Sequence, residues 1–153
     1  MDSQRLQLFK KITVDYFSKL SPGDEPVLES PYLQFGEPAL LDYASLVRIR
    51  GEEEGCLYLT SPVGLLHRLL KIHGETEVSD RTLRDMCREL SNVLAGNASE
   101  AFQGGWEISV PQSLGPGELA GLELPPSAFV MPFRWSGATA FLVVGLERGA
   151  VGP

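Results

Sequence analysis

The chain begins with the hydrophobic spacing of a helix. Apolar side chains recur three or four positions apart over residues 3–20, as on one face of an amphipathic helix, at Leu6, Phe9, Ile12, Tyr16, Phe17 and Leu20. The pattern then changes to short β-type runs, PYLQF, LLDYASLVRIR and GCLYLTS, separated by breaks that contain Gly or Pro. These runs predict a meander of three antiparallel strands between residues 27 and 61, with a solvated acidic turn at residues 51–55.

Two helices are predicted in the middle of the chain. The first covers VGLLHRLLKIH and ends at Gly74, and a longer one covers RTLRDMCRELSNVLAGNASEAFQ, with Ser79 or Asp80 as its N-cap and Gly104-Gly105 at its end. Strand patterns return at WEISVP, AFVMPFRW and ATAFLVVGLE. The order predicts an α+β fold, a two-layer sandwich of about three helices packed on a largely antiparallel sheet of about six strands.

A Pro- and Gly-rich segment at residues 112–127 interrupts the last group of strands. It is too long for a routine connection, and segments of this length are often functional flaps or disordered. It carries four leucines, at Leu114, Leu119, Leu122 and Leu124. The leucines favour a loop or short strand folded onto the body of the protein, and the alternative is a flap that docks a partner.

Composition narrows the class of protein. With 153 residues, of which 43% are hydrophobic, residues 1–153 are expected to form one domain with a self-sufficient core. The net charge of −7 disfavours nucleic acid and an anionic membrane surface as partners, because both attract Lys and Arg. No stretch approaches the roughly 18 apolar residues of a membrane span, and the N-terminus lacks a signal-peptide pattern. We therefore expect a soluble, cytoplasmic protein.

Few residues suit metal or redox chemistry. Cys56 and Cys87 are separated by 30 residues and neither belongs to a CxxC pair, and His67 and His73 are the two histidines of the chain. No spacing among them is typical of a zinc site. We expect no metal site in this chain, with both cysteines acting as small buried apolar groups and both histidines as ordinary helix residues.

The long central helix carries the most informative surface. Its core face is expected to hold seven apolar or small residues, Leu83, Met86, Cys87, Leu90, Leu94, Ala98 and Ala101. Asp85, Glu89, Asn92 and Gly96 fall on the opposite side as consecutive neighbours in one row. A carboxylate and a carboxamide therefore project side by side, and the glycine one turn further on would let another backbone approach closely. By pattern alone, such a row is also typical of any solvated helix face.

The identity of these residues points to a family. Asp85, Glu89 and Asn92 form the pattern D-x-x-x-E-x-x-N within DMCRELSNVLAGNASEAF. This pattern, the LAGNA segment and the order of elements, with a strand ending in ISVP, resemble the CheX and CheC family of chemotaxis phosphatases. The chain has a single ExxN motif and is more similar to the CheX branch. It departs from the family in the short gap of 18 residues between Asn92 and Pro111 and in the segment at residues 112–127.

The resemblance implies a CheX-like phosphatase domain with a CheC-like fold. Such a protein hydrolyses the aspartyl phosphate of a CheY-like response-regulator receiver domain in chemotaxis or two-component signalling. Asn92 would hold the attacking water and Glu89 would pair with a lysine of the phosphorylated receiver, so both are the candidate catalytic residues. Asp85, Arg88 and Gly96 are the candidate partner-binding residues. The chain would need no cofactor of its own, because the receiver supplies Mg²⁺ at its phosphorylation site.

Other functions remain open from the sequence. A non-enzymatic CheX-like interaction module would bind a receiver domain or a flagellar-switch component and would have the same exposed pair. A homodimer is a possible assembly state of either protein, although the segment at residues 112–127 puts the family's mode of dimerisation in doubt. A small-molecule enzyme with a pocket near that segment is the third alternative, and no constellation of residues supports it.

Overall fold

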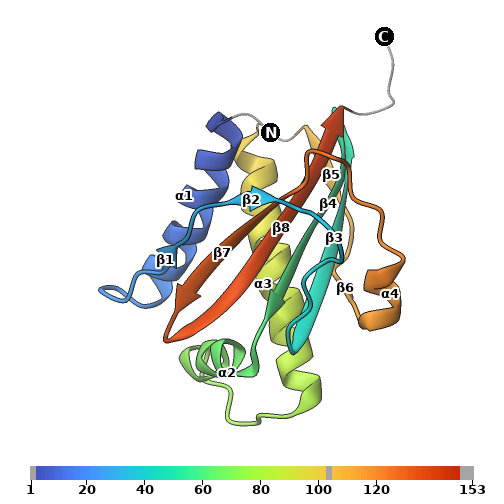
Figure 1. The fold of residues 1–153 in the computed structure, drawn as a ribbon. Coiled ribbons are helices and arrows are strands. Elements are labelled where there is room, and N and C mark those ends of the chain that lie inside the picture. The colour runs from blue at the N-terminus through green and yellow to red at the C-terminus, as the bar shows by residue number, and fades with distance from the viewer. Residues whose placement is uncertain (1–2, 103–104, 149–153) are drawn as a thin grey trace.

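The protein is described here from a computed structural model, which covers residues 3–102 and 105–148 (Figure 1). The helices in this part of the chain are α1 (Ser3–Leu20), α2 (Val63–Ile72), α3 (Asp80–Ala101) and the short α4 (Pro116–Ala120). The strands are β1 (Val27–Leu28), β2 (Tyr32–Leu33), β3 (Tyr43–Gly51), β4 (Glu53–Ser61), β5 (Trp106–Ile108), β6 (Gln112–Ser113), β7 (Phe129–Trp135) and β8 (Ala138–Arg148). The predicted α+β class is confirmed, with one more short helix and two more short strands than expected.

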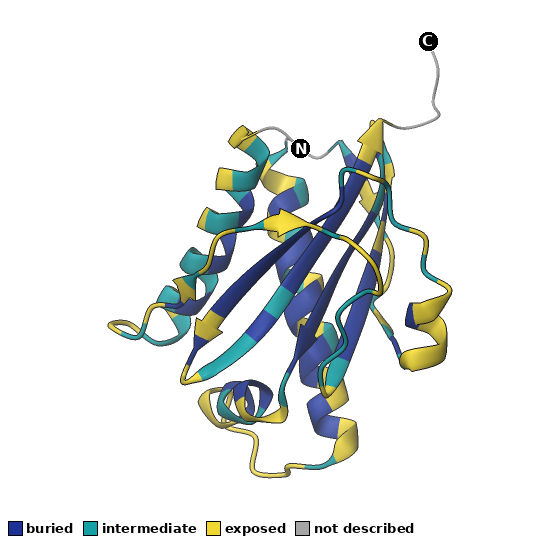
Figure 2. Ribbon diagram, in the orientation of Figure 1, coloured by how far each residue is buried: buried dark blue, intermediate teal, exposed yellow. Residues whose placement is uncertain are grey.

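The strands form one antiparallel sheet in the order β1-β7-β8-β4-β3-β5, in which β2 also pairs with β7 and β6 with β3. Helices α1 and α3 cover one face of the sheet and α2 lies at one end (Figure 1). The main core fills the space beneath these helices, where Phe17 of α1 packs against Phe133 and Trp135 of β7, and Phe9 of α1 packs against Phe129 of the same strand. Figure 2 shows how continuously the central strands are buried.

The predicted three-strand meander is wrong in its first strand. β3 and β4 pair as a hairpin, but Tyr32 and Leu33 pair with Val130 and Phe129 of β7, at the opposite side of the sheet. The reason lies in residues 34–42, which contain Gly36 and Pro38 and are too long for a tight hairpin turn. These residues instead cross the second face of the sheet, which is the face opposite to α1 and α3 (Figure 1).

The acidic turn between β3 and β4 is only partly solvated, which corrects the expectation for residues 51–55. Glu53 is 9% exposed and forms an ion pair with Arg5 of α1. Gly55 has a φ of +152° and lies against β8, where a Cβ atom would stand 1.8 Å from the carbonyl oxygen of Gly145. The turn therefore combines a charge contact to α1 with a backbone approach that only glycine allows.

Helix α3 forms as its sequence predicts and differs from the prediction at its end. Ser79 is the N-cap of a capping box, in which it accepts a hydrogen bond from the backbone N–H of Thr82. Ala101, expected on the core face, is exposed, because the ring of Phe102 packs between Phe9 and Trp106 at this level. The helix ends at Ala101, before the predicted stop at Gly104-Gly105, of which Gly104 lies outside the described residues.

The segment at residues 112–127 folds onto the second face of the sheet, as predicted. Leu114 and Leu119 are buried in a smaller core with Tyr58, Val130 and Val143. Leu122 and Leu124 are half-buried against the same cluster. The leucines therefore hold the segment, including α4, on the body of the protein.

The two cysteines are buried and free, as expected. Burial raises the pKa of the Cys56 thiol to about 11 and that of Cys87 to about 12. Both thiols are therefore protonated at neutral pH and are weak nucleophiles. Within residues 3–102 and 105–148, no helix is long and apolar enough to cross a membrane.

Candidate functional site

The predicted row on α3 faces solvent. Asp85, Glu89 and Asn92 are exposed and Gly96 is half-buried, whereas the opposite side of the helix is buried against the sheet. Nothing lies within 4 Å of the position that a Cβ atom of Gly96 would take. The four residues therefore form one accessible line, which we call the α3 row.

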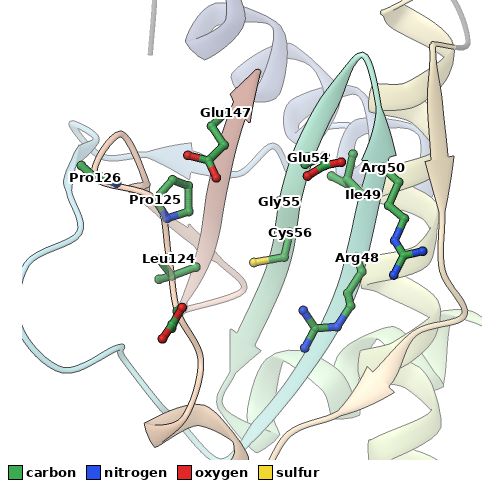
Figure 3. Close-up of a pocket in the computed structure, with 11 residues that line it drawn as sticks. Arg48, Ile49, Arg50, Glu54, Gly55, Cys56, Leu124, Pro125, Pro126 and Glu147 are labelled. Atoms are coloured by element: carbon green, nitrogen blue, oxygen red, sulfur yellow. The ribbon is translucent and has the colours of Figure 1, made fainter. Parts of the chain in front are cut away.

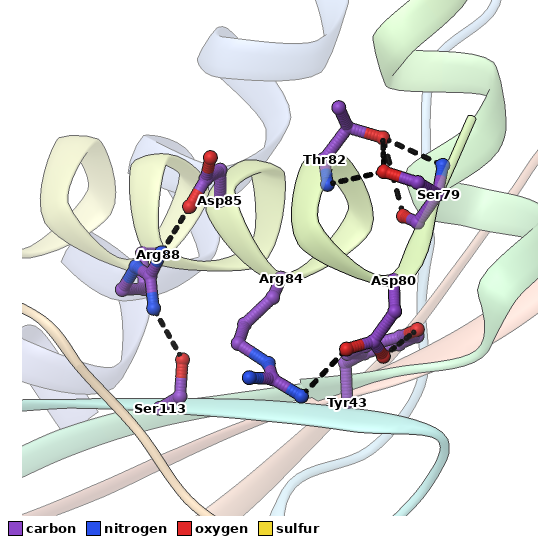
Figure 4. Close-up of polar contacts among 8 residues, drawn as sticks. All are labelled: Tyr43, Ser79, Asp80, Thr82, Arg84, Asp85, Arg88 and Ser113. Atoms are coloured by element: carbon purple, nitrogen blue, oxygen red, sulfur yellow. Dashed lines mark hydrogen bonds and ion pairs between the residues drawn. The ribbon is translucent and has the colours of Figure 1, made fainter. Parts of the chain in front are cut away.

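One end of the α3 row is tied to the sheet edge. The Arg88 guanidinium pairs with the Asp85 carboxylate one turn earlier and donates a hydrogen bond of 2.8 Å to the Ser113 hydroxyl of β6 (Figure 4). Arg88 is consequently half-buried. The two candidate partner-binding residues Asp85 and Arg88 thus satisfy each other, and a partner would extend this contact rather than meet two free charges.

Glu89 and Asn92 differ from Asp85 and Arg88 in their contacts. Neither side chain has a hydrogen-bond or ion-pair partner among the residues that the structure describes. Tyr16 of α1 lies within electrostatic range of Glu89. Burial, followed by the charge of Glu89, raises the pKa of the Tyr16 phenol to about 12. The phenol is therefore neutral at physiological pH.

Directional contacts fix α3 on the sheet. The Tyr43 hydroxyl of β3 donates a hydrogen bond of 2.7 Å to Asp80, which also pairs with Arg84 (Figure 4). At mid-helix, the hydroxyls of Ser91 and Ser45 are 2.8 Å apart, and both serines are buried. Sequence reasoning missed these contacts, as well as Tyr16 and Ser113, because their partners lie far away along the chain and no motif marks them.

The side chains of the α3 row can bind and orient other groups. A carboxamide accepts a hydrogen bond through its oxygen and donates through its NH₂ group without carrying charge, and a carboxylate one turn away binds cations. In the described part of the chain, no three His, Cys, Asp or Glu side chains gather to form a metal site.

A cavity of about 560 Å³ lies between β3, β4, β8 and the segment at residues 123–126 (Figure 3). Arg48 and Arg50 line it on one side and Glu147 and Pro125 on the other. Its one thiol, Cys56, has the raised pKa given above. The cavity opens on the face of the sheet opposite to α3, so it is separate from the α3 row.

A protein-family model matches more than half of the chain. The family model described as chemotaxis phosphatase CheX matches residues 43–131, which include the whole α3 row. No curated protein matches the chain in sequence.

Solved structures share the fold over nearly the whole chain. A CheC-like superfamily protein from Shewanella sp. PV-4 is 21% identical, with a TM-score of 0.79 over 96% of this chain and 99% of that protein. The chemotaxis protein CheX from Vibrio vulnificus is 20% identical, with a TM-score of 0.77 over 95% and 100% of the two chains.

A third structure contains a partner. It is the complex of CheX, CheY, BeF₃ and Mg²⁺ from Borrelia burgdorferi, and its matching chain is 15% identical, with a TM-score of 0.72 over 94% of this chain and 98% of that one. At these levels of identity the three structures demonstrate the CheC-like fold alone.

Proposed function

The chain belongs to the CheX family of chemotaxis phosphatases, and from this premise we propose that it hydrolyses the aspartyl phosphate of a CheY-like response-regulator receiver domain. The observation that carries the proposal is the exposed pair of Glu89 and Asn92, which lie about one turn apart without partners among the described residues. The Borrelia complex of CheX with CheY supports a receiver as the partner.

In the proposed mechanism Asn92 orients the attacking water. The water oxygen attacks phosphorus, the bond between phosphorus and the aspartyl oxygen breaks, and its electron pair goes to the carboxylate of the receiver. The water proton passes to a phosphate oxygen, so inorganic phosphate and free aspartate are the products. An acyl phosphate has a good leaving group, so placing one water in line is the main demand on the protein. The neutral carboxamide of Asn92 does this without repelling the phosphoryl group.

Glu89 has the complementary role of docking. Its carboxylate would pair with a lysine beside the phosphorylation site of the receiver, which fixes the register of α3 against the phosphate. The Mg²⁺ ion belongs to that receiver site in this mechanism. Asp85 and Arg88 would extend the contact as one neutral pair.

The direct test measures the loss of phosphate from a phosphorylated CheY-like receiver with and without this protein, in the presence of Mg²⁺. The proposal is supported if the protein accelerates dephosphorylation of the receiver but does not hydrolyse a chromogenic phosphomonoester when no receiver is present. Binding without acceleration would instead favour the interaction module. Efficient turnover of the phosphomonoester without a receiver would contradict the proposed mechanism.

Changing Glu89 should act through recognition. We expect Glu89→Ala to weaken binding of the phosphorylated receiver and Glu89→Lys to weaken it more, because two cations would meet. The free energy of unfolding should change by less than about 0.5 kcal/mol, as for exposed helix charges in general. Binding isotherms and urea denaturation measure the two effects.

Glu29→Lys is the matched control for Glu89→Lys. It makes the same charge change on an exposed residue between β1 and β2, at the other edge of the sheet. If both substitutions weakened receiver binding equally, the effect of Glu89→Lys would come from the net charge of the protein and not from a specific contact of Glu89. A large loss of stability with binding intact would make Glu89 a structural residue.

Gly96 allows stability and recognition to be separated. We expect Gly96→Ala to raise the free energy of unfolding by about 0.5–1 kcal/mol, because alanine favours the helix and a Cβ atom meets open space here. If the receiver backbone approaches this turn closely, the same substitution lowers affinity for the receiver. Gly64→Ala in α2, also in open space, should leave affinity unchanged. Unchanged affinity of Gly96→Ala would remove Gly96 from the interface.

A further inference from the structure

The α3 row is too small to be a complete docking surface. It offers four residues, one of them a glycine without a side chain, whereas a stable interface buries about 800 Å² on each partner and involves about 20–30 residues. A receiver placed on the α3 row must therefore also contact the elements that flank it. These are α1, on the side of Tyr16, and the sheet edge formed by β5 and β6, on the side of Ser113.

The sheet edge runs alongside α3 and is tied to it at two levels. The Ser99 hydroxyl donates a hydrogen bond of 3.4 Å to the carbonyl oxygen of Trp106, and Arg88 bonds to Ser113 as described above. Val110 lies between the two ties on the sheet edge, as Asn92 and Gly96 lie between them on the helix. Val110 is therefore level with the functional end of the α3 row.

Val110 has an unusual environment for a valine, because 85% of its surface is exposed. The other exposed large apolar residues in the described part of the chain lie elsewhere, four of them between residues 27 and 35 near the opposite sheet edge and three within or after α2. An exposed apolar side chain beside a polar functional row is typical of an interface anchor.

The backbone that carries Val110 is held in place. The N–H of Ser109 donates to the carbonyl oxygen of Arg48 at 2.9 Å, and the Arg48 N–H donates to the Ser109 hydroxyl at 2.9 Å. Burial of Val110 by a partner would therefore cost little conformational entropy, because the segment is already ordered.

We propose that Val110 and the β5–β6 edge form the second part of the receiver-docking surface. The partner is the receiver domain, which would present an apolar patch beside its phosphorylation site to Val110 while its phosphate meets the α3 row. Val110 contributes affinity and selectivity and takes no part in the chemistry. This inference rests on the proposed function and adds to it a recognition element outside the family motif.

The test compares Val110→Asp and Val110→Ser with the wild type and with Val27→Asp. Val27 is 52% exposed on β1, so its substitution introduces the same charge at the far edge of the sheet. The measurements are the Kd for a CheY-like receiver carrying BeF₃ and Mg²⁺ and the kcat and KM for dephosphorylation. Both Val110 variants should raise Kd and KM, Val110→Asp by about tenfold or more, with kcat within about twofold of wild type. Val27→Asp should change neither constant.

Three outcomes overturn the inference. They are an unchanged Kd in both Val110 variants, an equal loss in Val27→Asp, and a loss that light scattering traces to the breakdown of a homodimer. These outcomes bear on the role of Val110 only when the wild-type protein binds and dephosphorylates the receiver. A wild-type protein that does neither contradicts the proposed function itself, so the two failures are distinguishable.

Discussion

Replacing Asn92 by alanine is expected to slow receiver dephosphorylation by about a hundredfold while receiver binding and the fold persist. Asn92 is exposed, and its side chain has no hydrogen-bond or ion-pair partner among the described residues. Its removal should therefore cost the protein little stability. The loss should fall on kcat, because in the proposed mechanism the carboxamide orients the attacking water while Glu89 keeps its contact to the receiver.

The measurement is single-turnover loss of phosphate from the receiver at saturating protein, with Kd measured on the BeF₃ form. Asn97→Ala is the matched control, since Asn97 is another exposed asparagine on α3 that lies outside the α3 row. Undiminished turnover by Asn92→Ala would remove this residue from the mechanism. An equal effect of Asn97→Ala would indicate damage to the helix instead.

Gly55→Ala should be the most destabilising single substitution that we propose. The φ of +152° is strained for any residue with a Cβ atom, and that atom would stand 1.8 Å from the Gly145 carbonyl oxygen. Relief requires the backbones of β4 and β8, neighbours in the middle of the sheet, to separate. We expect a loss of at least about 3 kcal/mol in the free energy of unfolding, or failure to fold.

Urea denaturation measures this effect, with Gly64→Ala as the control. The same change at Gly64 meets open space in a helix and should stabilise the protein by about 0.5 kcal/mol. A loss below about 1 kcal/mol in Gly55→Ala would show that the two strands adjust more easily than their geometry implies.

The elements with strong local signals could be predicted from the sequence. The apolar spacing of α3 determines which side meets the sheet, so the exposure of Glu89 and Asn92 followed from the same pattern that placed Leu90 and Leu94 in the core. The motif added the expected chemistry. Both inferences need only residues within a few turns of each other.

Contacts between distant segments could not be predicted in this way. The pattern of PYLQF describes a strand but carries no information on its neighbour, and Tyr32 pairs with Val130 rather than with the next strand along the chain. The bond from Arg88 to Ser113 and the exposure of Val110 likewise depend on how β5 and β6 return to β3. A helix pattern also fails at its last turn, where Phe102 displaces Ala101 from the core.

The hydroxyl pair of Ser45 and Ser91 has a mechanical consequence. A helix held by apolar contacts alone can roll about its axis or slide along the sheet, because dispersion forces have no preferred direction. The buried bond between these serines, directly beside Asn92 in the chain, resists both motions. In the proposed mechanism, stiffness at this point would fix the position of the Asn92 carboxamide against the receiver, and small displacements of a positioning group are costly in rate. The rate of dephosphorylation at the outer surface of α3 would therefore depend, in the proposed mechanism, on a polar contact on its inner side.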